Sequence, residues 1–371
     1  MRSLGLMLCK CNKTDIQTAC KMPCRMWITG LNPFQADTNA LLKEIDLPKL
    51  LNMNAISSEI LVWFGPLYAF IAHEKTLYTF SVLMEQRKTL HFDAAIVSLA
   101  ANSKYCLVLL SSGRLLKYDP LEDHSSSLVF LGVEVEKDDH SNESITHIAC
   151  GEFVGVACTS MNGVYNIPNK TATLPKHVRI LKVVAGFEHC LLLTTNGDVY
   201  SWGGGLRGQL GNGEIVAAQD HPQLVAALAG VKIVDISAEG WHSAAVSSFG
   251  DLYTWGWNNQ GQLGLSDQKH HGRVVSLPQL VTMLDGEEVT VEKVHCGVGH
   301  TVVEVTTLDG ARNALVVGWD LKKRFDYEQA VVAPTFAGFR QLDQPEKEAG
   351  VSVVVGAGAN QIYFLHQSRF E

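Results

Sequence analysis

Three histidines recur at one position of a repeated sequence pattern, and they are the first candidates for chemistry. His189 and His242 stand 53 residues apart in similar surroundings, and His300 follows a related Cys-Gly-Val-Gly segment. A catalytic histidine works within one constellation of base, nucleophile and orienting groups. Because these histidines recur once per unit, we interpret each as a structural residue that fixes its unit by a hydrogen bond. We therefore predict no catalytic residue.

Two other patterns resemble cofactor or metal sites but lack the context that such sites need. Cys9, Cys11, Cys20 and Cys24 follow the spacing C-x-C-x₈-C-x₃-C, which matches no common zinc finger. The string G-x-G-x-x-G over residues 203–208 precedes no expected helix, so it does not indicate a dinucleotide site. We expect neither a metal nor a cofactor.

Two tryptophans and an arginine stand outside the repeated pattern and are candidate partner-binding residues. Trp241 and Trp257 each lie next to a glycine in an expected turn, and Arg207 lies in the equivalent loop of the preceding unit. An exposed Trp or Arg on a rigid loop is a typical interface anchor. The alternative is that the tryptophans are buried plugs between units, and the sequence alone leaves both interpretations open.

The elements that must position these residues form a repeat. Three landmarks recur at the same offset of 53 residues: His189 and His242, Trp202 and Trp255, Gln209 and Gln262. A period near fifty residues is typical of propellers and solenoids. Within one unit, residues 190–193 predict a buried strand, 196–198 a turn, and 199–202 a returning strand. The structural repeat positions are His189, Trp202, Gly203, His242, Trp255, Gly256 and His300.

Weaker copies on both sides extend the repeat along the chain. The expected blade centres lie near residues 68–80, 97–118, 146–166, 181–203, 233–256, 291–319 and 351–366, and the last is completed by residues 26–30. Pairing the first and last strands would remove the open edges of a linear sheet. The sequence therefore predicts an all-β, seven-bladed β-propeller over residues 26–371 with N- and C-terminal strand closure and degenerate N-terminal blades.

Residues 1–25 precede the first expected strand, and two interpretations of them stay open. They carry five Lys or Arg and one acidic residue, which suits an unstructured leader or a targeting signal. They could equally be a start-site extension, since Met22 and Met26 stand just ahead of that strand.

Composition favours a protein partner over nucleic acid or membrane. The formal net charge is −8, and direct binding to DNA needs many Lys and Arg on phosphates. The nine cysteines are an odd number and do not indicate a disulfide framework, so we expect a reducing compartment. No apolar run reaches the length of a membrane span.

The repeated unit consists of a histidine followed by Gly-Asp-Val/Leu-Tyr, Trp-Gly and Gly-Gln-Leu-Gly. This unit resembles the repeat of the regulator-of-chromosome-condensation family. Residues 181–213 and 233–264 match it with high specificity, and the segment from Cys296 to Trp319 matches moderately. The part before residue 180 departs strongly from the pattern. Family members are seven-bladed propellers, so the resemblance implies the same fold as the repeat count.

Within the family, the runs at 201–211, 240–243 and 255–258 are most similar to a small animal member that is a lone propeller. This resemblance implies a non-enzymatic protein-interaction scaffold, a chromatin-associated partner of a jumonji-type histone demethylase or hydroxylase. It implies roles in transcriptional repression or chromosome segregation, with a nuclear or chromosomal location and a cytoplasmic pool. The alternative is a guanine-nucleotide exchange factor for a small GTPase, as the founding member is for Ran.

Overall fold

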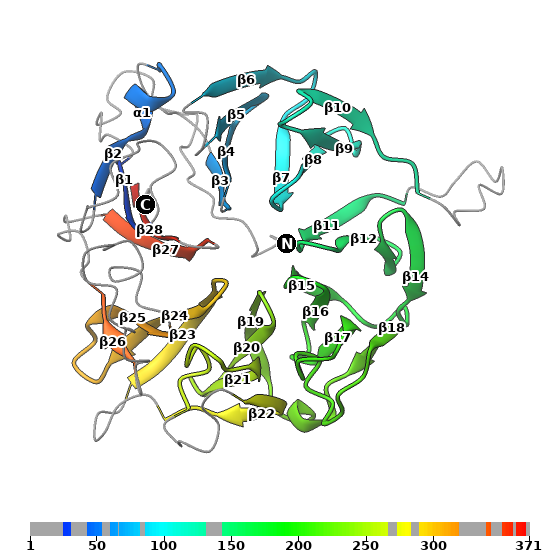
Figure 1. Cartoon of the computed structure of the whole chain (residues 1–371), viewed down its shortest axis with the longest axis vertical. Helices are drawn as coiled ribbons and strands as arrows, with labels where there is room; N and C mark the ends of the chain where they lie inside the picture. The colour runs from blue at the N-terminus through cyan, green and yellow to red at the C-terminus, as the bar shows by residue number, and fades with distance from the viewer. Residues whose placement is uncertain are drawn as a thin grey trace.

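The described strands form a ring of seven blades. The computed structural model describes residues 25–30, 43–53, 60–65, 67–81, 86–130, 143–265, 273–282, 289–318, 339–342, 351–358 and 361–368. These residues contain seven four-stranded antiparallel sheets arranged around a central axis (Figure 1). The other regular elements are the short helix α1 (Leu47–Leu50) and a 3-10 turn at Ala226–Leu228. The prediction of an all-β, seven-bladed β-propeller is confirmed.

The first three blades follow one another in chain order. Blade one contains β3 (Ile60–Phe64), β4 (Tyr68–His73), β5 (Thr76–Ser81) and β6 (Arg87–His91). Blade two contains β7 (Ile96–Ala101), β8 (Cys106–Leu110), β9 (Leu115–Asp119) and β10 (His124–Ser127). Blade three contains β11 (Ile145–Cys150), β12 (Gly155–Thr159), β13 (Gly163–Asn166) and β14 (Asn169–Thr173).

The next three blades include the two with the clearest sequence repeat. Blade four contains β15 (Ile180–Ala185), β16 (His189–Thr194), β17 (Val199–Gly204) and β18 (Ala218–Leu224). Blade five contains β19 (Ile233–Glu239), β20 (His242–Ser247), β21 (Leu252–Trp257) and β22 (Val274–Leu280). Blade six contains β23 (Val289–Cys296), β24 (His300–Thr307), β25 (Arg312–Gly318) and β26 (Arg340–Gln341).

The seventh blade joins the two ends of the described chain. Its strands run in the order β2 (Lys43–Asp46), β1 (Arg25–Gly30), β28 (Gln361–Ser368) and β27 (Val351–Ala357). In the β1–β28 pair, Met26 lies opposite Leu365 and Gly30 opposite Gln361. The predicted closure between residues 26–30 and the C-terminal strand is confirmed.

The core lies between neighbouring blades, because each blade packs its faces on the next. Along β16 every side chain is buried, whereas all four residues of β10, at the rim, are exposed. Between blades four and five, Leu191, Ile236 and Trp255 belong to one buried apolar cluster. In blade four the second strand β16 is more buried than the inner strand β15, and the outer strand β18 is the most exposed. The loops at the two flat faces can present functional side chains.

Some sequence predictions fall on residues outside this description. The leader or extension over residues 1–25 overlaps the described chain only at Arg25, the first residue of β1. The four N-terminal cysteines and Trp319 also lie outside the described residues. The predictions about them stay predictions.

Candidate functional site

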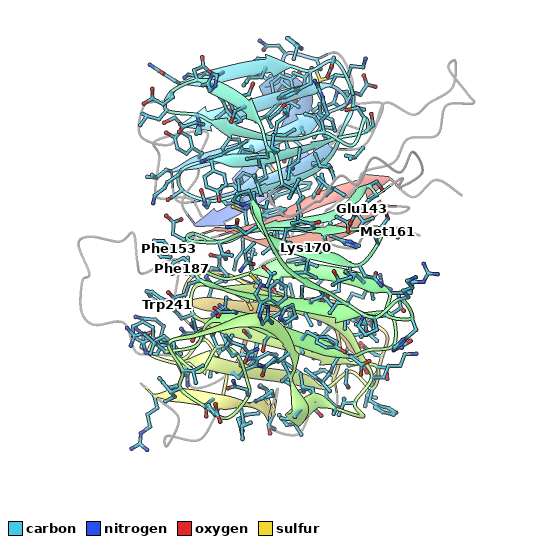
Figure 2. The ribbon with its side chains drawn as sticks, turned by 90° about the vertical axis from the view of Figure 1, so that its right-hand side faces the viewer. Glu143, Phe153, Met161, Lys170, Phe187 and Trp241 are labelled. Atoms are coloured by element: carbon cyan, nitrogen blue, oxygen red, sulfur yellow. The ribbon has the colours of Figure 1, made fainter. Side chains whose placement is uncertain are left out.

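One flat face of the ring is built from the loops that join each inner strand to the second strand of its blade. Phe153 lies between β11 and β12, Phe187 between β15 and β16, and Trp241 between β19 and β20. Figure 2 shows the three side chains in a row along one side of the disc, away from Met161 on the opposite side. The loops after the third strands reach this same face, and they carry Arg207.

Four aromatic rings on this face form a continuous row, which we call the aromatic arc: Phe153, Phe187, Trp241 and Trp257. The ring centres of Phe153 and Phe187 are 6.5 Å apart, those of Phe187 and Trp241 4.8 Å, and those of Trp241 and Trp257 5.1 Å. The two Phe–Phe and Phe–Trp contacts are edge-to-face, a geometry that aromatic pairs prefer. The arc crosses blades three, four and five.

Arg207 and Glu188 orient the tryptophan end of the arc. The guanidinium carbon of Arg207 lies 4.1 Å from the centre of the Trp257 ring and 5.6 Å from that of Trp241, within the range of a cation–π contact. The indole nitrogen of Trp241 donates a hydrogen bond of 3.1 Å to Glu188 Oε1. Trp241 and Trp257 are half-buried and Arg207 is exposed, so these three residues meet at the surface rather than in the core.

Backbone hydrogen bonds between blades hold the loops of the arc in place. The amide of Phe153 donates to the carbonyl of Phe187 at 2.7 Å, and the amide of Phe187 donates to the carbonyl of Gly240 at 2.8 Å. On the other side, Asn102 Nδ2 donates to the carbonyl of Gly151 at 3.0 Å. The arc is therefore presented by a hydrogen-bonded series of loops whose conformation is fixed before any partner binds.

The repeat histidines connect one blade to the next. His189 Nε2 lies 2.8 Å from the hydroxyl of Ser243 in blade five, and that hydroxyl donates to the carbonyl of Gln209 at 2.9 Å. His242 Nε2 lies 2.9 Å from the hydroxyl of Thr301 in blade six, which donates to a carbonyl in the same way. Since each hydroxyl has one proton and uses it on the carbonyl, the histidine Nε2 must be the donor.

These two histidines are neutral at physiological pH. Burial, together with the nearby His242, lowers the pKa of His189 to about 3. Burial lowers the pKa of His242 to about 4. His300 is also buried and lies opposite Gly318, the same register that places His189 opposite Gly203. The geometry of His189 and His242 is that of structural hydrogen-bond donors.

The repeat tryptophans are fully buried and also bond across blades. Trp202 Nε1 donates to Asn166 Oδ1 in blade three at 2.9 Å, and Trp255 Nε1 donates to the carbonyl of Gln209 in blade four at 2.8 Å. The glycine after each tryptophan has a positive φ, +98° at Gly203 and +103° at Gly256. A Cβ on Gly256 would lie 2.5 Å from the carbonyl oxygen of Trp241, so this position requires glycine.

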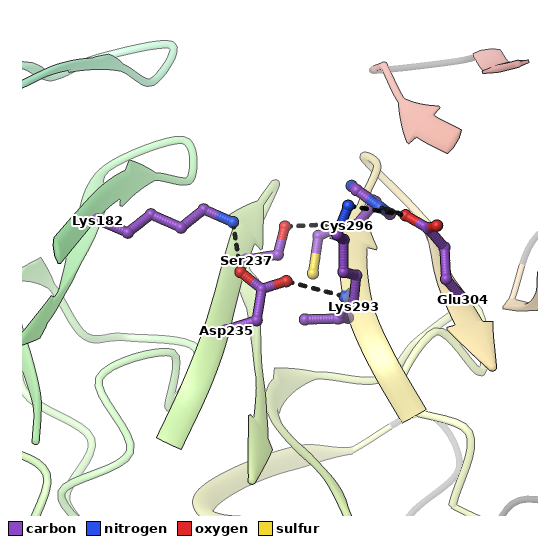
Figure 3. A network of polar contacts seen from close by, with 8 residues as sticks. Lys182, Asp235, Ser237, Lys293, Cys296 and Glu304 are labelled. Carbon is purple, nitrogen blue, oxygen red and sulfur yellow. Dashed lines mark hydrogen bonds and ion pairs between the residues drawn. The ribbon is translucent and has the colours of Figure 1, made fainter. Parts of the chain in front are cut away.

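A polar network ties the inner strands of blades four, five and six together (Figure 3). Lys182 Nζ lies 2.7 Å from Asp235 Oδ1, and the second carboxylate oxygen of Asp235 accepts from the amide of Val294 at 3.1 Å. Ser237 Oγ accepts from the amide of Cys296 at 2.9 Å. Both side chains of the ion pair are 13% exposed, so it is shielded from solvent. This network links the inner strands of three successive blades.

Sequence reasoning singled out Trp241, Trp257 and Arg207, which the structure brings together, but it missed Phe153, Phe187 and Glu188. The two phenylalanines lie in loops that the repeat pattern does not constrain. A signal was nevertheless present: each stands just before the second strand of its unit, where Trp241 also stands.

Two classes of site find no support in the described part of the chain. No group of three or more His, Cys, Asp or Glu side chains there is placed to hold a metal ion. Among the same residues, no helix has the length and apolar character needed to cross a membrane. The five cysteines of the described ranges, Cys106, Cys150, Cys158, Cys190 and Cys296, are free thiols.

Comparison with known proteins supports the repeat assignment. Two family models, both described as the regulator of chromosome condensation (RCC1) repeat, match this chain. One matches residues 196–246 and 250–303, and the other residues 180–209 and 233–262. These segments cover most of blades four and five and part of blade six, where the sequence repeat is clearest.

Individual relatives match about a third of the chain. The chain is 42% identical over 118 residues to human RCC1 domain-containing protein 1, covering 31% of each chain. It is 42% identical over 126 residues to the human E3 ubiquitin-protein ligase HERC2, covering 33% of this chain and 2% of that protein. The matched segment thus spans under a third of the length of these relatives.

The structural similarity to known proteins covers more of the chain than the sequence similarity does. Prp20p from Saccharomyces cerevisiae, whose crystal structure was reported with its binding properties to Gsp1p and histones, superposes with a TM-score of 0.66. The match covers 94% of this chain and 92% of Prp20p at 17% identity, which shows a shared fold. Residues 180–303 of the chain thus carry regulator-of-chromosome-condensation (RCC1) repeats, and the chain has the fold of an RCC1-like propeller.

Proposed function

We propose that this chain is a non-enzymatic protein-interaction scaffold that binds a jumonji-type histone demethylase or hydroxylase on chromatin, with the aromatic arc and Arg207 as the contact surface. The observation that carries the proposal is the arc itself. Four rings and a guanidinium lie on hydrogen-bonded loops of one face, partly open to solvent. Trp, Tyr and Arg side chains dominate binding energy in protein interfaces.

The rigidity of the arc supports a scaffold role. The loops are linked by backbone hydrogen bonds of 2.7 and 2.8 Å, so little conformational entropy is lost when a partner binds. Meanwhile His189 and His242, two of the three histidines considered as candidates for chemistry, are buried and occupied by contacts between blades. A face with pre-formed anchors and buried titratable groups suits binding better than catalysis.

The chromatin context and the identity of the partner rest on resemblance. The RCC1-type repeats are shared with human RCC1 domain-containing protein 1, and the fold with Prp20p, a protein described as binding histones. The runs at 201–211 and 240–243 resemble the lone-propeller member associated with a jumonji-type enzyme. The proposal includes a nuclear and chromosomal location with a cytoplasmic pool, and no direct contact with DNA.

The test is affinity purification of the tagged full chain from cells, with identification of its partners, beside nucleotide-exchange assays on a panel of small GTPases. The proposal expects a jumonji-type oxygenase among the partners and no acceleration of nucleotide release. Acceleration of release from any GTPase would favour the exchange-factor alternative. Recovery of partners without a jumonji-type enzyme would refute the named partner.

A further inference from the structure

Three neighbouring blades each place a carboxylate on the loop that carries an arc ring. Glu152, Glu188 and Glu239 each stand within two residues of a ring of the arc. All three side chains are half-buried. The arc is therefore accompanied by one acidic group per blade across blades three, four and five.

Neutral donors, rather than cations, hold these carboxylates. Glu152 accepts from the amide of Ser103 at 3.2 Å and also from its hydroxyl, and Glu188 accepts from the Trp241 indole. Glu239 Oε1 accepts from the amide of Gly240 at 3.3 Å. Within the described ranges, none of the three forms an ion pair. The described cations of this face, Arg207 and Lys104, contact the arc rings and form no described ion pair with these three carboxylates.

Burial is the main cause that raises the pKa of Glu239 to about 7, and the charge of Glu152 adds to it to a smaller extent. This carboxyl is therefore about half protonated at neutral pH. A cation brought to this place would favour the ionised carboxylate. The electrostatics of the loops therefore agree with a positively charged occupant.

The rings offer cations a second contact. Phe153 is 68% exposed, and its ring centre is 6.5 Å from that of Phe187. In an extended peptide, side chains on one side recur at about 6.6–6.8 Å, twice the rise of a strand. Arg207 stacks on the tryptophans and shows how a guanidinium sits on this surface. Alternate side chains of an extended segment would thus match the spacing of Phe153 and Phe187, while the two spacings at the tryptophan end, 4.8 and 5.1 Å, are shorter.

We propose that the arc face docks an extended basic segment of the partner, with Arg or Lys at alternate positions placed over the arc rings and beside Glu152, Glu188 and Glu239. The inference rests on the proposed scaffold function and specifies the partner's docking element. The net charge of −8 adds long-range attraction for such a segment. The alternative is that the face binds an acidic segment through its cations, Arg207 and Lys104. Lys104 Nζ lies 5.8 Å from the Phe153 ring centre.

The experiment measures fluorescence anisotropy of the full chain with two labelled probes, a peptide of alternating Arg and Ala and a matched peptide of alternating Glu and Ala. We expect the Arg peptide to bind and the Glu peptide not to bind. Raising the salt concentration should weaken the binding, since the carboxylates are partly exposed to solvent. Tighter binding of the Glu peptide would overturn the proposal in favour of the acidic segment.

Variants locate the binding on the arc face. The double change Phe153→Ala with Glu188→Gln should weaken the binding of the Arg peptide about tenfold, because it removes one ring and one charge. Phe249→Ala is the matched control, since Phe249 is 83% exposed and lies on the β20–β21 turn at the opposite face. The proposal would also be overturned if the double variant and Phe249→Ala weakened the binding of the Arg peptide equally, or if neither weakened it.

The same probes separate this inference from the scaffold proposal. If cellular partners are lost from a Trp241→Ala variant while the Arg peptide shows no binding to the unmodified chain, the arc is an interface and its occupant is not basic. If the Arg peptide binds the arc but no cellular partner depends on it, the basic-segment chemistry stands and the scaffold function fails.

Discussion

The guanidinium of Arg207, in the loop after β17 of blade four, stacks on the ring of Trp257 at the end of β21 in blade five, at 4.1 Å from the carbon Cζ to the ring centre. The same guanidinium lies 5.6 Å from the centre of the Trp241 ring. One exposed cation of blade four thereby contacts two aromatic rings of blade five.

Replacement of Arg207 should disturb the tryptophans without unfolding the ring. Arg207→Ala should change the intrinsic tryptophan fluorescence of the folded protein, while urea denaturation shows a loss of stability of about 1 kcal/mol or less. Arg207→Lys should retain more of the native spectrum, because it keeps the charge. An unchanged emission spectrum for Arg207→Ala would show that the stacking is absent in solution.

His242 should stabilise the junction between blades five and six, and a Gln variant provides a matched control. The chain itself has Gln361 opposite Gly30 in blade seven, the register that His242 shares with Gly256. At neutral pH, His242→Ala should lower the free energy of unfolding by about 1–3 kcal/mol, because it leaves the Thr301 hydroxyl without its donor. His242→Gln should lower the free energy of unfolding less than His242→Ala does. A His242→Ala protein of native stability that binds no partner would contradict the structural role.

The same residue predicts a dependence of stability on pH. The pKa of His242 is about 4 in the folded protein against 6.5 for the unperturbed side chain, so between these values the unfolded chain binds more protons. Acidification from pH 6.5 to 4 should therefore destabilise the unmodified protein by up to about 3 kcal/mol more than His242→Gln. Denaturant titrations of both proteins across this range provide the measurement. Parallel pH profiles would contradict the prediction.

Gly256 should be far less replaceable than another glycine with a similar backbone. Gly256→Ala and Gly113→Ala both place a side chain at positive φ, which costs about 1–2 kcal/mol. A Cβ at Gly113 meets nothing within 4 Å, whereas at Gly256 it meets the Trp241 carbonyl at 2.5 Å. Gly256→Ala should thus lower the free energy of unfolding by at least about 1 kcal/mol more than Gly113→Ala, as measured by thermal or urea unfolding. Equal losses would show that this loop relaxes freely.

Removal of β1 should open the ring. A variant that lacks residues 1–30 leaves β2 and β28 without the strand between them, and it deletes Met26, which is fully buried. We expect this variant to be unfolded or aggregated by circular dichroism and size-exclusion chromatography, because open sheet edges pair with other chains. A variant that lacks residues 1–24 keeps β1 and is the control, with native-like melting expected. Native-like melting of both variants would contradict closure by β1.

The repeat made much of the fold predictable, and the reasons are local. The turn glycines, the buried strand over residues 190–193 and the Trp-Gly pairs depend on short-range chemistry that recurs in each unit. Closure by residues 26–30 followed from counting half-blades. The outer strands were not predicted, because β10 (His124–Ser127) has four exposed polar residues and no apolar alternation. β3 (Ile60–Phe64) was missed because its blade departs from the repeat.

The candidate site was predictable only in part. Trp241 and Trp257 were recognisable as residues outside the pattern, but the sequence could not decide between an exposed and a buried position. Phe153 and Phe187 join them through contacts between blades, which no single unit encodes. The histidine bonds were expected within a unit, and the structure places them between units. The hydroxyl residues that directly follow the next histidine, Ser243 and Thr301, were the overlooked sign of this arrangement.

The most direct test of the central claim, that the arc face binds the protein partner, is a comparison of partner recovery for three forms of the tagged chain. These are the unmodified chain, Trp241→Ala with Trp257→Ala, and Phe249→Ala on the opposite face. At roughly 2 kcal/mol or more per anchor, the double variant should weaken the complex about a hundredfold or more while it stays folded. Phe249→Ala should bind like the unmodified chain. Full recovery of the same partners by a folded double variant would contradict the claim.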